Sequence, residues 1–272
     1  MTPAALAQVL YGATGAGGSA AATLYVLDPA TGGVVSTIGP IGFPVTGLAV
    51  HPTTGVLYGT TGIEIGTPSL IRINTTTGAG TLIGANSCGP IADISFRTDG
   101  TLFGWSQCNQ GDLVTINLST GVEAVVGLSG ISPKTQGSGL AFSPGGTLFF
   151  TGSSSNGALR TINPATGAPT TVATLNGAPA VQPINALAFS AGGVLYGSLR
   201  GFPAGSLITI DTSTGLVTNI GTTVGGLDAL AFGPSAAPPP TLVPANIPTL
   251  SEWAMIVLSL LIVGSVLLLR RR

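Results

Sequence analysis

One stretch decides the fold of this chain: Leu159-Arg160-Thr161-Ile162-Asn163-Pro164-Ala165-Thr166-Gly167. Its second half, an Asp or Asn followed after two residues by Thr-Gly, recurs four more times, beginning at Asp28, Asn74, Asn117 and Asp211. The steps between successive Asp or Asn positions are 46, 43, 46 and 48 residues. A period of that length, built from short apolar runs and turn residues, indicates a repeat architecture with one supersecondary unit per period.

Each period predicts four strands, because its runs are rich in β-branched and aromatic residues and are bounded by Gly or Pro. Strand A is of the Gly-Leu-Ala-Phe type and occurs at Gly47–Val50, Ala92–Phe96, Gly139–Phe142, Ala186–Phe189 and Ala229–Phe232. Strand B is of the Leu-Tyr-Gly type and occurs at Val56–Gly59, Thr101–Gly104, Thr147–Phe150 and Val194–Gly197. Strand C leads into the Asp or Asn of the motif, and strand D is a β-branched run such as Thr170–Leu175 or Val217–Ile220.

Four-stranded units of this length are typical of β-propeller blades. Four blades are continuous in sequence, at roughly 47–84, 91–127, 139–175 and 186–221. The C-terminal end adds a lone strand A, and its partners are expected at the N-terminus: strand B at Val9–Gly12, C at Leu24–Asp28 and D at Val34–Ile38. We therefore predict an all-β, five-bladed β-propeller over residues 9–235, closed by one blade that is split between the termini and leaves no open edge.

The repeated Asp and Asn side chains are predicted to shape turns. In each turn between strands C and D, the Asx side chain can bond the backbone two residues on, and the Gly takes the left-handed conformation. The functional alternative is a ladder of calcium sites, which needs more carboxylates, at EF-hand-like or RTX-like spacing, than these turns contain. We expect a structural role for Asp28, Asn74, Asn117, Asn163 and Asp211.

The long, irregular connections join strand B to C or strand D to the next strand A. In an up-and-down blade these connections lie at one end, opposite the short A–B and C–D turns. Variable loops on a rigid scaffold are where binding residues concentrate. The candidate ligand-binding residues on this irregular face are Phe43, Glu64, Trp105, Asp112, Lys134, Arg200 and Phe202.

Cys88 and Cys108, the only cysteines, stand at nearly equal distances in sequence from the turn between strands Ile91–Phe96 and Thr101–Trp105. They are therefore expected to meet across the open end of that hairpin, at a separation that a disulfide accepts. Two unpaired thiols are the alternative. Two interpretations of Trp105 stay open: a platform that stacks on a sugar, and a side chain that packs against this end of the hairpin.

Composition narrows the class of protein. Charged residues make up 6% of the chain, against roughly 25% in an average soluble domain. Before Glu252, five basic residues stand against eight acids, which leaves a formal charge of −3. Apolar residues are too plentiful for a disordered chain, and the basic stripe that nucleic-acid binding needs is absent. A β-rich extracellular protein with a neutral surface, and no nucleic-acid partner, is expected.

Both ends of the chain carry segments outside the repeats. Residues 1–8 are interpreted as the remnant of a secretory signal, since Ala5-Leu6-Ala7 has small residues of the cleavage type, or as a frayed start. Residues 236–246 are rich in Pro and predict a stiff spacer. Residues 253–269 are uncharged and are followed by Arg270, Arg271 and Arg272.

This uncharged run predicts a transmembrane helix. It has 17 residues and would be about 25 Å long, at the short limit for crossing a bilayer. Trp253 suits one membrane interface, and the three arginines suit the cytoplasmic side, which places the propeller outside the cytoplasm. A buried core helix is the alternative, which the arginines and the Pro-rich spacer disfavour.

The tail resembles the IPTL-CTERM sorting signal, a relative of the PEP-CTERM signals. It shares the motif Ile247-Pro248-Thr249-Leu250-Ser251-Glu252-Trp253, a single helix and a basic end, although Ala254 stands where that family commonly has Gly. The resemblance implies that an exosortase-type transpeptidase of a Gram-negative bacterium recognises Ile247–Leu250, removes the helix and passes the protein to the envelope or the extracellular matrix. The body more loosely resembles bacterial quinoprotein-like or YVTN-type propeller repeats, and that resemblance implies a fold but not an activity.

Catalytic chemistry has little support in the sequence. His51 is the only histidine, which excludes a multi-His metal site, and it lies in an A–B turn. We expect no catalytic residue, no metal and no cofactor. Asp93 and Asp228, near strand A, are conceivable as a carboxylate pair in the central channel. Arg72 and Arg160 are candidate partners for these acids, and exposed blade edges explain the two arginines equally well.

Three functions follow from these observations. The first is a non-enzymatic, exported and envelope-sorted propeller whose irregular face binds a surface or matrix component, such as a polysaccharide. The second is an extracellular lyase or hydrolase that acts at the central channel. The third is a purely structural surface protein, and the scarcity of histidine and of acidic clusters disfavours the enzyme.

Overall fold

The computed structural model describes residues 8–17, 22–63, 66–108, 112–131, 137–152, 157–177, 183–201 and 203–234, together with residues 257 and 260. The chain divides into two compact units, residues 1–236 and residues 237–272. In the second unit only Val257 and Leu260 are described, and both are helical and exposed. The predicted spacer, sorting motif and terminal arginines lie outside the described residues.

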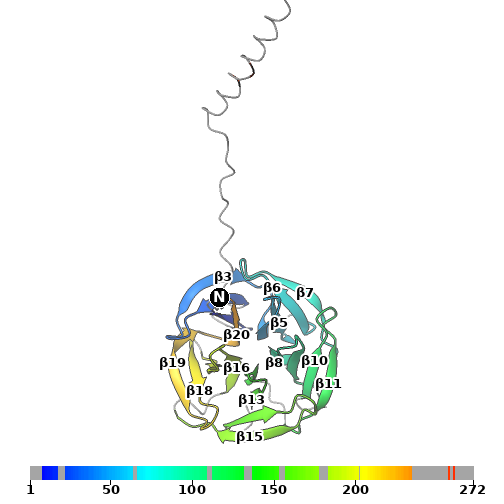
Figure 1. The fold of residues 1–272 in the computed structure, drawn as a ribbon, viewed down its shortest axis with the longest axis vertical. Coiled ribbons are helices and arrows are strands. Elements are labelled where there is room, and N and C mark those ends of the chain that lie inside the picture. The colour runs from blue at the N-terminus through cyan, green and yellow to red at the C-terminus, as the bar shows by residue number, and fades with distance from the viewer. Residues whose placement is uncertain are drawn as a thin grey trace, which may run out of the picture. The chain divides into compact units, whose positions relative to one another are not determined.

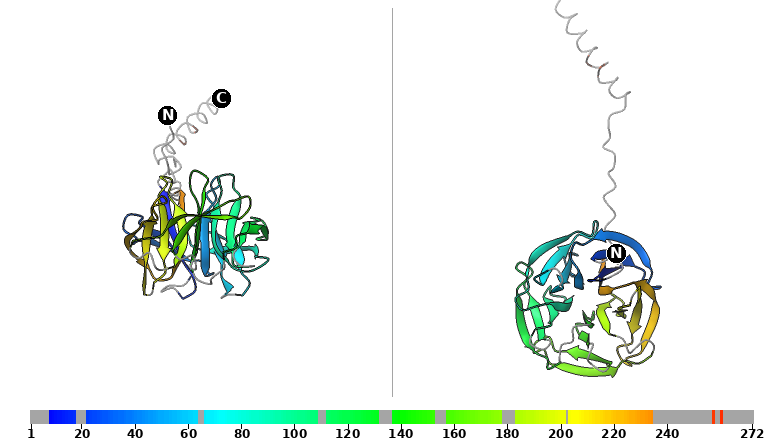
Figure 2. Two further views of the ribbon diagram at one scale, coloured as in Figure 1. Left: turned by 90° about the horizontal axis from the view of Figure 1, so that it is seen from below. Right: turned by 180° about the vertical axis from the view of Figure 1, so that it is seen from behind.

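The first unit is a ring of five antiparallel sheets, each of four strands (Figure 1). The same ring is seen from the side and from behind in Figure 2. We number the sheets as blades 1 to 5 in chain order. The predicted five-bladed β-propeller with four-stranded blades is thus confirmed.

The blades differ little in strand length, and in each blade strands A to D follow one another from the inner to the outer edge. Blade 1 contains β20 (Leu227–Pro234), β1 (Gln8–Thr14), β2 (Thr23–Leu27) and β3 (Val34–Pro40). Blade 2 contains β4 (Val45–Val50), β5 (Leu57–Thr61), β6 (Ser69–Ile73) and β7 (Gly80–Ala85). Blade 3 contains β8 (Ile91–Phe96), β9 (Leu102–Ser106), β10 (Asp112–Ile116) and β11 (Glu123–Leu128).

The last two blades repeat this arrangement. Blade 4 contains β12 (Ser138–Phe142), β13 (Leu148–Gly152), β14 (Ala158–Ile162) and β15 (Pro169–Thr174). Blade 5 contains β16 (Ile184–Phe189), β17 (Leu195–Leu199), β18 (Ala204–Ile210) and β19 (Val217–Val224).

Blade 1 closes the ring from both ends of the repeat region. Its inner strand β20 pairs antiparallel with β1, with Leu10 opposite Phe232, and the two strands lie side by side in Figure 1. The split blade is therefore confirmed, and β20 is longer at both ends than the Ala229–Phe232 strand expected from the sequence. Because β1 and β20 are far apart in sequence, their pairing ties the two ends of the propeller together.

The Asx-x-x-Thr-Gly motif forms the turn between strands C and D in every blade, as predicted. The side-chain oxygen of Asp28, Asn74, Asn117, Asn163 and Asp211 accepts a hydrogen bond from the backbone N–H two residues on, at 2.8–2.9 Å. The Gly that ends the motif donates its N–H to the carbonyl of the Asx residue, at 2.8 Å in each blade. All five of these glycines have a positive φ of 72–83°.

The same glycines also join neighbouring blades. A Cβ added to Gly121 of blade 3 would lie 2.5 Å from the carbonyl oxygen of Gly84 in the outer strand of blade 2. Gly78 and Gly167 face Gly39 and Gly127 in the same way. Glycine is therefore required twice at this position, once by the left-handed backbone and once by the close approach of the next outer strand.

The hydrophobic core is divided among the five blade interfaces. Each of five clusters of buried residues draws its members from two adjacent blades, for example Tyr58 of blade 2 with Ile94 of blade 3. Four interfaces contain a pair of aromatic rings, with centroids 5.2–5.6 Å apart: Tyr58–Phe96, Phe103–Phe142, Phe149–Phe189 and Tyr196–Phe232. The Phe that ends the Gly-Leu-Ala-Phe repeat is thus an inter-blade packing residue, whose tilted ring geometry is favourable.

Candidate functional site at the mouth of the channel

The five inner strands align by counting back from their A–B turns, where each pairs with its strand B in the same register; at the opposite end this register shifts in four blades and continues unbroken in blade 4. Their ends are marked by Val50 opposite Leu57 and by the matching pairs Phe96–Leu102, Phe142–Leu148, Phe189–Leu195 and Phe232–Leu10. Four residues before these marks stand five equivalent positions, which hold Thr46, Ala92, Ser138, Asn185 and Asp228. We call these five positions the polar ring. Their side chains differ chemically, whereas the residue two positions further along each inner strand is Leu or Ile in every blade.

The polar ring lines a cavity of about 250 Å³. Connections of the irregular face complete its wall, with Ala16, Gly62, Ile63, Pro90, Gln107, Gly137 and Arg200. A second cavity of about 220 Å³ lies at the other end of the inner strands, near the A–B turns, and is lined by Val50 and the four phenylalanines of the inner strands. Of the two, only the first carries charged side chains among its described lining residues.

Three side chains form a hydrogen-bonded cluster in the first cavity. Asn185 donates its Nδ2 to Oδ1 of Asp228, at 2.6 Å. The Arg200 guanidinium lies 3.6 Å from Oδ2 of the same carboxylate, and its Nη2 donates to the carbonyl oxygen of Ala16, at 2.7 Å. Because the Arg200 side chain keeps 33% of its exposure and Asp228 12%, both charges face the cavity rather than the core.

Two glycines make room for this cluster. A Cβ added to Gly15 would fall on Oδ2 of Asp228, at 1.8 Å, and one added to Gly137 would lie 2.9 Å from Oδ1 of Asn185. Gly137 also has a positive φ of 70°. The backbone therefore approaches the polar side chains as closely as it does only because these positions lack a side chain.

Asp93 lies one residue further along its inner strand and is fully buried. Its Oδ1 accepts the N–H of Ile94, and its Oδ2 accepts the N–H groups of Leu140 in blade 4 and Leu187 in blade 5, at 2.9–3.1 Å. Burial raises the pKa of Asp93 well above its ordinary value, against the lowering effect of the three N–H groups. The carboxylate joins three inner strands, and it is absent from the lining of the cavity.

The idea of a carboxylate pair formed by Asp93 and Asp228 is therefore wrong, since only Asp228 reaches the cavity. The suggested arginine partners also change. Asp228 is paired with Arg200, whereas Arg72 is exposed on β6 and Arg160 lies half-buried on β14. Successive side chains of strand C point alternately toward the core and away from it, and these two arginines lie on the side that points away.

Of the residues proposed on the irregular face, the structure places Arg200 in the cavity. Phe43 is half-buried and packs against the core between blades 1 and 2. Trp105 is 2% exposed, and its ring lies 3.9 Å from that of Phe150. This burial leaves no open face on which a sugar could stack. Trp105 packs against Phe150 of blade 4, a contact that neither interpretation from the sequence predicts.

The structure describes no side-chain position for the other residues proposed on the irregular face. Glu64, Lys134 and Phe202 lie outside the described residues. Asp112 begins β10, where it stands opposite Ser106 and Leu128, and its side chain lies outside what is described. His51 is a turn residue, as expected, because its Nδ1 accepts the N–H groups of Thr53 and Thr54 at 3.2–3.3 Å.

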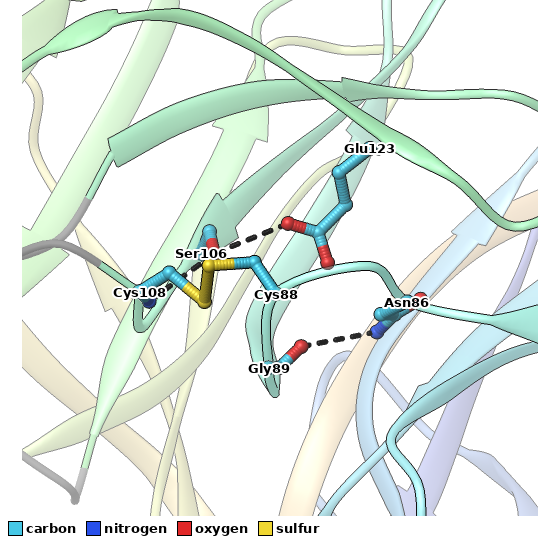
Figure 3. The surroundings of a disulfide bond; sticks show 6 residues. All are labelled: Asn86, Cys88, Gly89, Ser106, Cys108 and Glu123. Atoms are coloured by element: carbon cyan, nitrogen blue, oxygen red, sulfur yellow. Dashed lines mark hydrogen bonds between the residues drawn. A yellow bond between two sulfur atoms is a disulfide. The ribbon is translucent and has the colours of Figure 1, made fainter.

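Cys88 and Cys108 are joined by a disulfide, the pairing that the sequence predicts, with Cα atoms 5.9 Å apart. Figure 3 shows the bond beside Ser106, whose hydroxyl donates to Glu123 at 3.3 Å and accepts the N–H of Cys108 at 3.2 Å. Burial raises the pKa of Glu123. Asn86 supports the neighbouring turn by donating to the carbonyl of Gly89, at 3.4 Å.

Sequence reasoning missed Thr46, Ser138, Asn185 and Gln107 as cavity residues. A signal for the first three is present in the sequence: once the inner strands are aligned, the position nearest the irregular face is polar in four of the five blades. Gln107 follows β9, outside the inner strands, and this alignment does not find it. Within the described residues, no group of three or more His, Cys, Asp and Glu side chains is arranged to hold a metal ion.

Comparison with known proteins now gives the chain a family. A family model described as a repeat of unknown function (DUF6923) matches residues 93–235, which is more than half of the chain. The chain belongs to the DUF6923 repeat family. In this member the matched residues run from Asp93 of blade 3 through the end of β20.

The tail of this DUF6923 protein matches a second model, the IPTL-CTERM motif, over residues 245–272. The resemblance noted in the sequence is therefore confirmed. The motif implies export, sorting to the cell envelope and processing by a sorting enzyme. Among the described residues, the structure contains no helix of the length and hydrophobicity needed to cross a membrane; residues 253–269 are described only at Val257 and Leu260.

Solved structures share the fold of this DUF6923 protein at low identity. A chain from the crystal structure of a nidogen/laminin complex is 16% identical, with 85% of this chain and 100% of that chain covered and a TM-score of 0.58. TolB from Acinetobacter baumannii is 14% identical over 84% and 66% of the two chains, with a TM-score of 0.51.

A protein of unknown function from Bacteroides thetaiotaomicron is 17% identical over 79% and 64% of the chains, with a TM-score of 0.52. At such identities the likeness establishes the propeller architecture alone. No curated protein matches the chain.

Proposed function

We propose that this protein is a non-enzymatic, exported propeller that binds a component of the cell surface or extracellular matrix through the cavity at the mouth of its channel. The observation that carries the proposal is the polar ring. Toward the A–B turns the five inner strands share the pattern Leu or Ile, then Ala or Ser, then Phe or Val, but they end in Thr46, Ala92, Ser138, Asn185 and Asp228 at the other face.

The chemistry of the cavity supports binding rather than catalysis. Its described lining holds a single carboxylate, Asp228, already paired with Arg200, and no histidine. General acid–base catalysis needs a group whose proton is exchanged during the reaction, and hydrolysis of a glycosidic bond commonly uses two carboxylates. A lyase or hydrolase at the channel stays the alternative.

The tail belongs to the same proposal. Residues 253–269 would hold the precursor in the inner membrane, with Arg270, Arg271 and Arg272 on the cytoplasmic side, until an exosortase-type transpeptidase acts at Ile247–Leu250. The IPTL-CTERM match supports this order of events. The processed propeller would then reach the envelope surface or the matrix, where the component that its cavity binds is located.

The test is retention of the full chain on matrix polysaccharide isolated from the native host. The variant Asn185→Ala/Ser138→Ala removes an amide and a hydroxyl from the cavity, and the fold is expected to tolerate it because Ala92 occupies the equivalent position in β8. Retention of the native chain and at least about tenfold weaker retention of the variant are expected, since each lost hydrogen bond weakens binding severalfold.

The matched control is Asp211→Asn, which changes a carboxylate in a C–D turn where three other blades already use Asn. It should bind like the native chain. Equal retention of all three proteins would place the binding surface elsewhere, and conversion of the polysaccharide into shorter products by the native chain would favour the enzyme.

A further inference from the structure

The two charges on the described lining of the cavity oppose each other. Arg200 and Asp228 are the charged side chains of its described lining, and they lie 3.6 Å apart. An anionic ligand near Arg200 would also meet the Asp228 carboxylate, and a cation near Asp228 would meet the guanidinium. The pair therefore gives little net attraction to an ion of either sign.

The remaining polar groups suit hydroxyl partners. Asn185 and Gln107 carry amides, and Thr46 and Ser138 carry hydroxyls. Asn185, Gln107 and Ser138 can each both donate and accept a hydrogen bond, as a sugar hydroxyl does, whereas the Thr46 hydroxyl donates to the carbonyl oxygen of Ile91 at 2.7 Å and is left as an acceptor. With the acceptor oxygens of Asp228 and the donors of Arg200, they offer the mixed pattern that neighbouring hydroxyl groups on a ring require.

Apolar groups line the same cavity. Ile63 is 64% exposed at the rim of the cavity, and Ala16, Pro90 and Ala92 line it. Sugar rings combine polar edges with apolar C–H faces, so a site that offers both polar and aliphatic groups fits them better than a wholly polar site would. Stacking on Trp105 is not needed for this contact.

The cavity ends blindly. Asp93, Ala186 and Ala229 form the next layer along the inner strands, and each is fully buried. The second cavity, at the other end of the channel, has a separate lining. A polymer cannot thread through such a layer, so only the end of a chain can reach the full depth of the cavity.

Its size allows a short occupant. The volume of about 250 Å³ falls below the roughly 300–1,000 Å³ typical of sites for drug-sized ligands. One sugar ring or a short polyol fits this space. The inner strands on which the polar ring stands hold these groups rigidly, and a rigid site loses little entropy on binding.

We infer that the channel-mouth cavity is an end-group site, which binds the terminal unit of an uncharged polysaccharide through its hydroxyl groups. This inference rests on the proposed function and deepens it, because it names the chemistry and the part of the polymer that is recognised. Gly15 and Gly137 belong to the site as positions where a side chain would displace Asp228 or crowd Asn185.

The first experiment titrates the full chain with neutral hexoses, neutral linear oligosaccharides and hexuronates, and follows the ligand by saturation-transfer NMR. Neutral sugars are expected to bind with millimolar affinity and hexuronates at least about tenfold more weakly, because a carboxylate would lose its hydration in the cavity without a net attraction to offset the loss. Saturation should concentrate on one terminal ring of the oligosaccharide. Stronger binding of the hexuronates, or equal saturation along the chain, would overturn the inference.

The second experiment uses Asp228→Asn, which keeps the size of the side chain and leaves Arg200 without its carboxylate. Neutral-sugar binding should fall about tenfold, and hexuronate binding should rise above that of the native chain. Asp211→Asn, which makes the same chemical change in a turn, should leave both unchanged. If Asp228→Asn keeps the native preference for neutral sugars over hexuronates, the inference is contradicted.

Folding of each variant is checked by its thermal unfolding transition, and Ser138→Ala provides a milder second probe. It removes one hydroxyl, places at β12 the residue that β8 already has, and should weaken neutral-sugar binding severalfold. If native matrix is retained and the Asn185→Ala/Ser138→Ala variant loses this retention, but no sugar binds, the end-group inference fails and the proposed function survives. If matrix is not retained either, both fail.

Discussion

Asp93 shows how one residue can serve three blades at once. Its carboxylate accepts N–H groups from β8, β12 and β16 while it is fully buried. The equivalent positions in the other blades hold Gly47, Gly139, Ala186 and Ala229, so the carboxylate occupies space that small residues leave near the axis.

A pH dependence of stability follows from the raised pKa of Asp93. A carboxyl whose pKa is higher in the folded state than its unfolded value of about 3.9 contributes its stability below that value and loses it as the pH rises. The free energy of unfolding of the native chain, measured in urea, should therefore decline above about pH 4 relative to Asp93→Asn. Parallel pH profiles of the two proteins would contradict this.

Asp211 serves as the counterpart, because its pKa is lowered to about 2 by hydrogen bonds from Ser213 and from the backbone of Thr214. A lowered pKa has the opposite sign: its stability is present above the unfolded pKa and is lost as the pH falls. Asp211→Asn should therefore change the free energy of unfolding on the acidic side of the pH profile, where Asp93→Asn does not change it.

The glycine of the repeated motif provides a second test at the residue scale. Gly121→Ala would place a Cβ 2.5 Å from the carbonyl oxygen of Gly84, on a backbone with a φ of 75°. We expect a loss of on the order of 2–3 kcal/mol in the free energy of unfolding. Gly146→Ala is the control, since it has a similar φ of 84° and its Cβ would meet nothing within 4 Å; an equal cost for both would show that inter-blade contact is unimportant.

Trp105 illustrates why single residues are hard to place from sequence. Four blades have a small residue at its position in strand B, and four have Gly where Phe150 stands. The two departures compensate each other across the interface between blades 3 and 4, where the rings stack. Each departure is visible in the aligned repeats, but their contact appears only once the blades are assembled.

At the scale of elements, the sequence predicts the strands and turns well because each has a local cause. The Asx side chain, the following Gly and the alternation of apolar residues all act within a few residues of one another. The irregular connections have no such local rule. Residue type is the only guide to candidates there, and of those that the structure describes only Arg200 lines the cavity.

The disulfide is an element-scale constraint on the irregular face. It links the β7–β8 connection to the segment after β9, across 20 residues. Closing a loop of this length contributes about 3 kcal/mol in the chain-entropy description. The double variant Cys88→Ala/Cys108→Ala should lose about that much in urea unfolding, and reduction of the native chain should lower its stability to the same level. A loss confined to one of the two treatments would contradict this account.

At the scale of the whole molecule, the repeat count and the split blade follow from sequence because a ring must close. The lone strand A at the end and the missing strand A at the start have one solution, which β20 and β1 provide. The sorting motif begins at residue 245, after β20 ends at Pro234. Processing within the motif therefore leaves every strand of the ring in the mature protein.

The most direct test of the account is the intact mass of the mature protein, purified from the envelope and the medium of its native host. We expect a C-terminus within or near Ile247–Leu250, with residues 253–272 removed and the propeller still folding as one cooperative unit. A mature protein that retains Arg272 would contradict sorting by the IPTL-CTERM route and leave a simple membrane anchor in its place.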